Sequence, residues 1–401
     1  MPGIIAKKIE KKGITPELMT DACVFVATAI THYLLLIVKR RRRAWHSKLR
    51  PIYVPKSKQR HFTMADVDFE GQSIRSHFDE HGWVVVSGVL DDIEVSQAMS
   101  YVWDYLETAS RASLSHASTS RKPVSRGDPS TWASEGWPAT VEGGILPYFS
   151  SGQSSAAWSI RSNEKVKRIF RRFWGTENVL TSFDGLLVWR RSVKTECGWF
   201  HIDQNPVEKP GFETVQGLVN LVDGGVTTGG NVLISTSHKD FPQHYRENPL
   251  YASRLADLNG DDWLEVVSAD PILSRYEAEE KIVRLELERG DVLLWDSRVV
   301  HCSNSSETDE EEVDRIERAA VLVSMMPEDQ VSENCRKVRR AAVDAGRTGS
   351  HWVDKVAVLG AEREEEAALE RARYEGMKRL DEGRGAILGY GDMTEAMREL
   401  I

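Results

Sequence analysis

The chain has 401 residues, enough for one large domain or two ordinary ones. Hydrophobic residues make up 41% of it, which is typical of a globular protein with a sizeable core. The net charge of −9 argues against general nucleic-acid binding, and four scattered cysteines are too few for a disulfide framework.

Residues 1–63 form a basic leader that differs in composition from the rest of the chain. Within it, residues 22–38 read ACVFVATAITHYLLLIV, without an ionised side chain when His32 is neutral. The length of this segment is at the lower limit for a helix that crosses a bilayer, roughly 17–25 residues. A membrane segment and an unstructured leader before Met64 both stay open. We expect a cytoplasmic protein, with anchoring through residues 22–38 as the alternative.

An ordinary domain is predicted from residue 64 to residue 330. Its first elements are an amphipathic helix at 69–83 and a β-branched strand at 83–89, followed by a helix that Asp91 or Asp92 can cap. His77 and His81 have helical i, i+4 spacing, but no third ligand is near them in the sequence. We therefore interpret both as histidines on a helix surface.

The middle of the chain is predicted to be rich in strands. Residues 110–157 are rich in Ser, Gly and Pro and indicate a long loop, and residues 165–174 indicate a basic helix. Apolar strand patterns follow at 179–189, near Phe200, and at 214–222, 231–235, 283–287, 292–295 and 318–325. They predict a mainly β fold with flanking helices, a double-stranded β-helix of the jelly-roll or cupin-like barrel type. A helical insertion is expected at 241–280 and a helical extension at 331–401.

The stretch WFHIDQ contains a histidine and a carboxylate two residues apart, His201 and Asp203. In a strand such residues share one face, so both side chains can reach one metal ion. His301 follows a second strand about a hundred residues later. Two histidines and one carboxylate are the facial triad of non-haem Fe(II) oxygenases, which leaves coordination positions open.

An ordered set of motifs accompanies these residues. The HxD pair is followed by a Gly-rich turn, GGVTTGG, a strand that ends in Ser-His-Lys, Gly-Asp-Val before His301, and Arg318 at the start of a strand. Over roughly residues 67–327 the chain resembles the phytanoyl-CoA dioxygenase family of Fe(II)- and 2-oxoglutarate-dependent oxygenases. The resemblance implies that Fe(II), 2-oxoglutarate and O₂ are required and that His201, Asp203 and His301 are the metal ligands.

A cation is needed for the far carboxylate of 2-oxoglutarate, and a bidentate arginine fits it. We expect Arg318 in this role because it lies on an apolar strand. The acidic insertion before it makes the spacing from His301 longer than the family usually has, so Arg315 is a competitor. Ser303 shares a strand face with His301 and is a second candidate for binding the co-substrate.

The sequence therefore predicts a dioxygenase that hydroxylates or otherwise oxidises a small organic molecule, whose identity is not readable. The alternative is a catalytically silent barrel that acts as a membrane-tethered binding or scaffold protein. An acyl-CoA substrate has no support, because no basic site for its phosphates is evident near the motifs.

Overall fold

The computed structural model describes residues 49, 51–69, 71–115, 122–132, 136–141, 144–191, 193, 195, 198–306, 315–355, 364–381 and 385–401. The chain divides into the units Met1–Leu49 and Arg50–Ile401, and the second is described below. The membrane segment predicted at 22–38 lies outside the described residues. Within those ranges, every helix is too short or too polar to span a bilayer.

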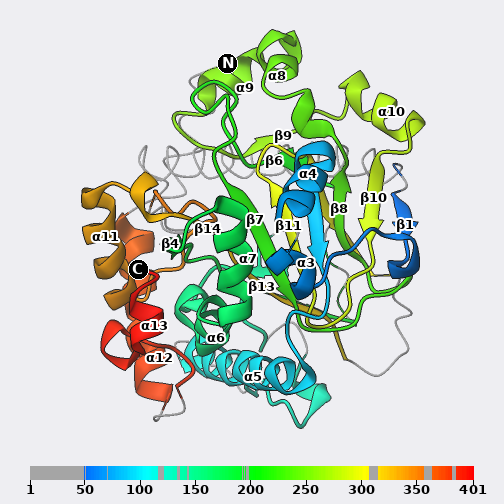
Figure 1. Cartoon of the computed structure of the whole chain (residues 1–401). Coiled ribbons are helices and arrows are strands. Elements are labelled where there is room, and N and C mark those ends of the chain that lie inside the picture. Colours follow the sequence, from blue (N-terminus) through cyan, green and yellow to red (C-terminus); the bar gives the residue numbers. More distant parts are fainter. Residues whose placement is uncertain are drawn as a thin grey trace, which may run out of the picture. The chain divides into compact units, whose positions relative to one another are not determined.

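Strands of the described chain form two six-stranded sheets (Figure 1). In order, the first sheet contains β1 (Ile52–Val54), β10 (Ile282–Leu285), β8 (Gly230–Ile234), β12 (His301–Asn304), β6 (His201–Ile202) and β9 (Leu264–Glu265). The second contains β2 (Trp83–Val86), β11 (Val292–Asp296), β7 (Val215–Asn220), β13 (Ile316–Leu322), β5 (Leu186–Arg190) and β3 (Ile145–Leu146). A separate pair joins β4 (Val179–Thr181) to β14 (Met325–Pro327).

The two sheets pack face to face through one apolar cluster. It takes Leu233 and Leu285 from the first sheet, and Val85, Leu218 and Leu293 from the second. The predicted two-layered, mainly β fold is thus confirmed. In the described ranges, however, the sheets do not join into a closed barrel.

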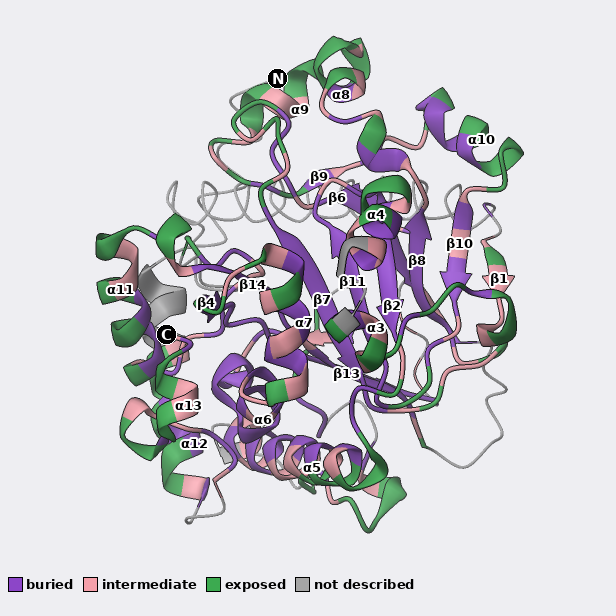
Figure 2. Ribbon diagram, in the orientation of Figure 1, coloured by how far each residue is buried: buried purple, intermediate pink, exposed green. Residues whose placement is uncertain are grey.

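Helices cover the other face of the second sheet. They are α5 (Asp92–Ser115), α6 (Ser155–Arg161) and α7 (Glu164–Trp174), which share a buried cluster with Val84, Val219 and Val292. Because this sheet is buried on both faces, its central strands are apolar runs, such as WVVV in β2 and VLLW in β11. Figure 2 shows both of these strands as buried.

The N-terminus of α5 has the predicted acidic cap. The Asp91 carboxylate accepts hydrogen bonds from the backbone N–H groups of Ile93 and Glu94, at 3.0 and 2.9 Å. The Glu94 carboxylate accepts in return from the backbone N–H of Asp91 at 2.9 Å, which completes a capping box.

The loop predicted at 110–157 is shorter than expected, because regular elements enter both of its ends and its middle. Helix α5 continues to Ser115, β3 adds an edge strand, and α6 begins at Ser155. A serine-rich composition indicated a loop, yet the Ser154 hydroxyl caps α6 by accepting from the backbone N–H of Ala157 at 3.2 Å.

Two further helices precede β2, α3 (Met64–Phe69) and α4 (Gly71–His81). The interpretation of His77 as a surface residue is wrong, since α4 turns it inward against Phe62 and Trp83 and leaves it 5% exposed. The 241–280 insertion contains α8 (Gln243–Glu247), α9 (Ala252–Asp257) and α10 (Pro271–Ala278), and its strand β9 pairs with β6.

The C-terminal region contains α11 (Glu333–Asp344), α12 (Glu364–Asp381) and α13 (Glu395–Arg398). Buried residues of this region, among them Val343 and Met377, belong to the same cluster as α5 and the second sheet. The domain limits at 63/64 and 330/331 stay predictions.

Candidate metal centre

His201 and His301 lie directly opposite each other on the antiparallel strands β6 and β12. Their ring centroids are 4.1 Å apart, and both side chains are buried, at 4% and 6% exposed. Sequence reasoning placed both residues on strands, and the strand register brings them together.

Asp203 completes the group from the turn after β6. Its Oδ1 lies 3.4 Å from Nε2 of His201, and its Oδ2 lies 3.3 Å from Nε2 of His301. One donor atom from each of the three residues lies within 4.8 Å of the others. Two imidazole nitrogens and a carboxylate oxygen at this spacing can bind one divalent metal ion on a single face.

Each imidazole is oriented by a carbonyl two residues earlier in the chain. Nδ1 of His201 lies 3.0 Å from the carbonyl oxygen of Trp199, and Nδ1 of His301 lies 2.9 Å from that of Val299. A carbonyl can only accept, so each Nδ1 carries the hydrogen and donates it. The lone pair of each ring is then on Nε2, which faces Asp203 and is the atom that a metal needs.

The carboxylate of Asp203 is held in its ionised form. Burial by itself raises the pKa of this carboxyl, but the neighbouring His201 and His301 outweigh burial and hold the pKa well below its usual range. Burial and His201 lower the pKa of His301. A neutral imidazole beside an ionised carboxylate is the protonation state that binds a metal ion.

Gln216, on β7, supports the carboxylate from the opposite sheet. Its Nε2 donates to Oδ2 of Asp203 at 2.9 Å. Sequence analysis did not identify this residue. The signal in the sequence was a glutamine within the apolar stretch VQGLVN. In the structure Gln216 is 6% exposed and shares a strand face with Leu218 of the intersheet cluster.

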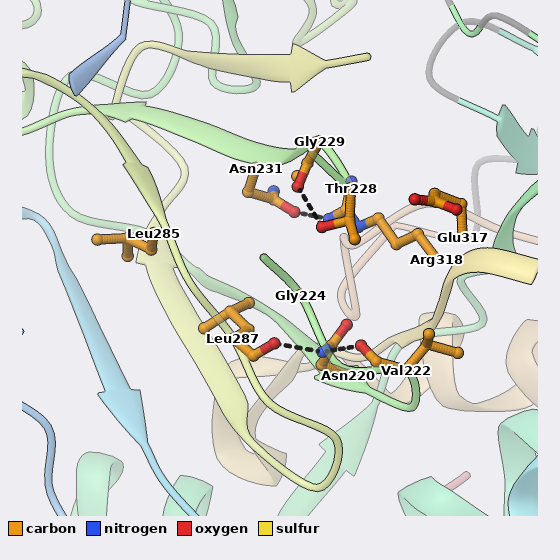
Figure 3. A pocket seen from close by; sticks show the side chains of 11 residues that line it. Asn220, Val222, Gly224, Thr228, Gly229, Asn231, Leu285, Leu287, Glu317 and Arg318 are labelled. Carbon is orange, nitrogen blue, oxygen red and sulfur yellow. Dashed lines mark hydrogen bonds between the residues drawn. The ribbon is translucent and has the colours of Figure 1, made fainter. Parts of the chain in front are cut away.

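Arg318 points between the two sheets. Its neighbour Ala320 belongs to the intersheet cluster, and strand alternation puts Arg318 on the same face. The guanidinium carbon lies 4.6 Å from the ring centroid of Trp189, and Nη2 donates to Oδ1 of Asn231 on β8. Figure 3 shows the side chain extending toward Asn231.

The Arg318 cation is buried without a protein counter-charge in the described chain. It is 5% exposed, and its Nη1 has no hydrogen-bond partner among the described residues. Burial lowers its pKa to about 9, which still leaves it charged at neutral pH. A small pocket beside Arg318 includes Thr228 and Asn231 in its lining, and the three candidate metal ligands are not part of that lining (Figure 3). A carboxylate of a bound molecule would satisfy Nη1.

Ser303 and Asn231 lie between Arg318 and the candidate metal ligands. Ser303 is paired with Asn231 across β12 and β8, two residues beyond His301, and it is 6% exposed. Two residues correspond to about 7 Å along a strand. Asn231 is a second residue that sequence reasoning missed, although an asparagine in the strand GNVLI was a visible signal.

Arg315 lies at the surface, unlike the buried Arg318. Its side chain is 57% exposed, and its Nε donates to the buried carboxylate of Glu317 at 3.0 Å. Glu317 also pairs with Arg191 at 3.3 Å. Arg315 therefore already has a carboxylate partner, unlike Arg318.

Comparison with known proteins agrees with these motifs. The sequence profile described as Phytanoyl-CoA dioxygenase (PhyH) matches residues 78–312, more than half of the chain. The chain belongs to the phytanoyl-CoA dioxygenase family. It is accordingly a 2-oxoglutarate-dependent non-haem iron dioxygenase, which requires Fe(II), 2-oxoglutarate and O₂.

Relatives of this dioxygenase include the "Ava biosynthesis cluster protein O" of Aspergillus versicolor. It is 28% identical over 237 residues, which cover 57% of this chain and 74% of the relative. The crystal structure of a hypothetical protein from Escherichia coli is 14% identical, with a TM-score of 0.52, and the match covers 98% of this chain and 94% of that one. This likeness supports the fold alone. The epimerase SnoN, solved with Fe³⁺, alpha-ketoglutarate and nogalamycin RO, gives a TM-score of 0.39 at 18% identity, over 64% of this chain and 83% of SnoN.

Proposed function

We propose that His201, Asp203 and His301 are the Fe(II) ligands of this dioxygenase. The observation that carries the proposal is the convergence of two imidazole nitrogens and one carboxylate oxygen within 4.8 Å. Both Nε2 atoms are free to coordinate because each Nδ1 donates to a backbone carbonyl. The three ligands leave room at the metal for a 2-oxo acid and O₂.

Arg318 is the proposed anchor for the far carboxylate of 2-oxoglutarate. Its Nη1 is buried without a partner among the described residues. Its Nη2 donates to Asn231, which is paired with Ser303, two residues beyond the candidate ligand His301. Ser303, opposite Asn231 on the intervening strand pair, is proposed to hydrogen-bond the same co-substrate. Arg315 is excluded from this role by its exposure and its pairing with Glu317.

The proposed reaction is hydroxylation of an unactivated C–H bond in a small organic molecule. Iron supplies the activation of O₂: one oxygen atom enters the substrate, and the other enters succinate as 2-oxoglutarate loses CO₂. Because its relative is a biosynthesis cluster protein, we propose that the substrate is a biosynthetic intermediate. Desaturation or ring closure would use the same residues.

The test is succinate release from wild-type enzyme supplied with Fe(II), 2-oxoglutarate and O₂, measured with and without a panel of small organic molecules. We expect succinate to depend on both Fe(II) and 2-oxoglutarate and to rise with the true substrate. If the protein binds neither Fe(II) nor 2-oxoglutarate, a catalytically silent scaffold protein is the better description.

A further inference from the structure

A segment after α11 crosses the structure to reach the candidate metal centre. We call residues 347–355 the strap. At its start, the Arg347 carbonyl accepts from Gln153 Nε2 at 2.7 Å, the Thr348 hydroxyl accepts from the backbone N–H of Gly152 at 3.1 Å, and the backbone N–H of Gly349 donates to the carbonyl of Phe183 at 2.7 Å. The strap lies outside the region that the family profile matches.

The far end of the strap is fixed to the turn that follows Asp203. The Lys209 ammonium lies 3.2 Å from the ring centroid of Trp352. Lys355 donates to the carbonyl of Gly260 at 2.7 Å and pairs with Asp262 at 3.3 Å. Lys209 pairs with the same carboxylate at 2.9 Å. The strap therefore connects to both the turn after Asp203 and the insertion that contains Asp262.

His351 lies between these two anchored ends. Its neighbour Trp352 packs on Lys209, six residues after Asp203, so the strap passes close to the candidate metal ligands. His351 is not one of the residues whose donor atoms meet within 4.8 Å, so it is not one of the candidate metal ligands. Its Nε2 is buried and has no hydrogen-bond partner among the described residues.

A buried nitrogen without a hydrogen-bond partner destabilises the fold, so its retention near the candidate metal ligands requires an explanation. Burial lowers the pKa of His351 to about 4, and the ring is neutral at neutral pH. A neutral imidazole can either donate to a carbonyl oxygen or accept from a hydroxyl group.

The surroundings of His201 are aromatic. The indole of Trp199 stacks on the His201 ring with centroids 4.6 Å apart, and that of Trp263 lies 5.9 Å away. Trp263 is 42% exposed, unusual for a side chain of this size. Trp189 and Trp295 belong to the intersheet cluster, whereas Trp199 is half-buried. Exposed aromatic faces favour flat, ring-bearing ligands.

We propose that His351 is a substrate-binding residue, whose Nε2 hydrogen-bonds a hydroxyl or carbonyl group of a ring-bearing substrate that packs against Trp263. The inference rests on the proposed function, since it takes the three ligands as the place of reaction. Lys209 and Lys355 share the single carboxylate of Asp262, at 2.9 and 3.3 Å.

The experiment compares two uncharged ring compounds that differ by one oxygen, 1-tetralone and tetralin. Their dissociation constants are measured anaerobically on the complex of the enzyme with Fe(II) and 2-oxoglutarate, from changes in its visible absorption. One hydrogen bond of about 1.4 kcal/mol corresponds to tenfold, so the wild type should bind 1-tetralone about tenfold more tightly than tetralin. In His351→Ala this preference should disappear, and His351→Asn should restore part of it.

His61→Ala is the matched control, because His61 is exposed and distant in sequence from the strap. It should keep the wild-type preference, and thermal melting should show that all variants are folded. An undiminished preference in folded His351→Ala overturns the role of His351, and failure of the wild type to bind either compound overturns the substrate class. The proposed function is judged separately, by Fe(II) stoichiometry and succinate release in the wild type.

Discussion

Gln216 and Asp203 come from opposite sheets and meet in a 2.9 Å hydrogen bond, with the amide Nε2 donating to the carboxylate Oδ2. The bond fixes the carboxylate beside both imidazoles, at 3.4 Å from His201 Nε2 and 3.3 Å from His301 Nε2. The orientation of the candidate metal ligand thus depends on how the two sheets pack.

Gln216→Leu should weaken Fe(II) binding about tenfold to a hundredfold, the usual cost of losing a residue that orients a metal ligand. The measurement is an anaerobic Fe(II) titration. Gln243→Leu is the matched control, because Gln243 is exposed on α8, and it should bind as the wild type does. Equal affinities of the two variants would show that Asp203 does not need the amide.

Replacement of His201, Asp203 or His301 by alanine should abolish turnover and reduce Fe(II) binding far more than Gln216→Leu does, since each change removes a donor atom. The wild type should bind one Fe(II) per chain in the same titration. Far-ultraviolet circular dichroism should show the sheets intact in each variant. Unchanged iron affinity in His201→Ala would refute the ligand assignment.

Arg318→Ala should raise the apparent constant for 2-oxoglutarate roughly tenfold to a hundredfold, since a charge-assisted hydrogen bond contributes about 1.5–3 kcal/mol. Arg315→Ala is a control of the same chemistry, and its constant should stay at the wild-type value because its side chain is exposed and pairs with Glu317. The reverse result in steady-state succinate assays would move the anchor to Arg315.

The presence of Asp203 predicts oxygen insertion without halogen transfer. A carboxylate in the triad occupies a coordination position that a halide would need, and its charge already balances part of the charge on Fe(II). Reaction in high chloride or bromide, followed by mass spectrometry of the product, should show no halogenated species. Halogenation by the unmodified enzyme would contradict the role of Asp203.

His77 should make the fold sensitive to acid. Burial and the neighbouring His81 lower its pKa from 6.5 to about 4 in the folded chain. A depressed histidine pKa means that its contribution to stability is complete above about pH 6.5 and is lost as the pH falls toward 4. At pH 5 the loss should be about 2 kcal/mol.

Urea unfolding at pH 7 and pH 5 tests this expectation. His77→Phe removes the titrating group, so the decrease in unfolding free energy between the two pH values should be about 2 kcal/mol smaller than in the wild type. The exposed control His61→Phe should keep the wild-type decrease. A decrease that His77→Phe leaves unaltered would assign the acid sensitivity to other groups.

The sequence by itself was sufficient to predict those features whose geometry follows from a local pattern. The two-residue spacing predicted that His201 and Asp203 converge, although Asp203 lies in the turn after β6. Strand alternation directed Arg318 between the sheets. Local signals also predicted the Asp91 cap of α5 and most of the strands. These features depend on neighbours a few residues away, which the period of a strand or helix fixes.

Only the tertiary structure decided which distant residues meet. The Gln216–Asp203 bond requires the two sheets to pack, and the pairing of His201 with His301 depends on strand register. His351 reaches the site because the strap docks on the pair of Lys209 and Asp262. Lys209 lies more than a hundred residues earlier in the chain than His351. The burial of His77 likewise depends on packing against Trp83 and Phe62. The period of a strand or helix does not encode such contacts, because they depend on the strand registers and on the packing of the whole chain.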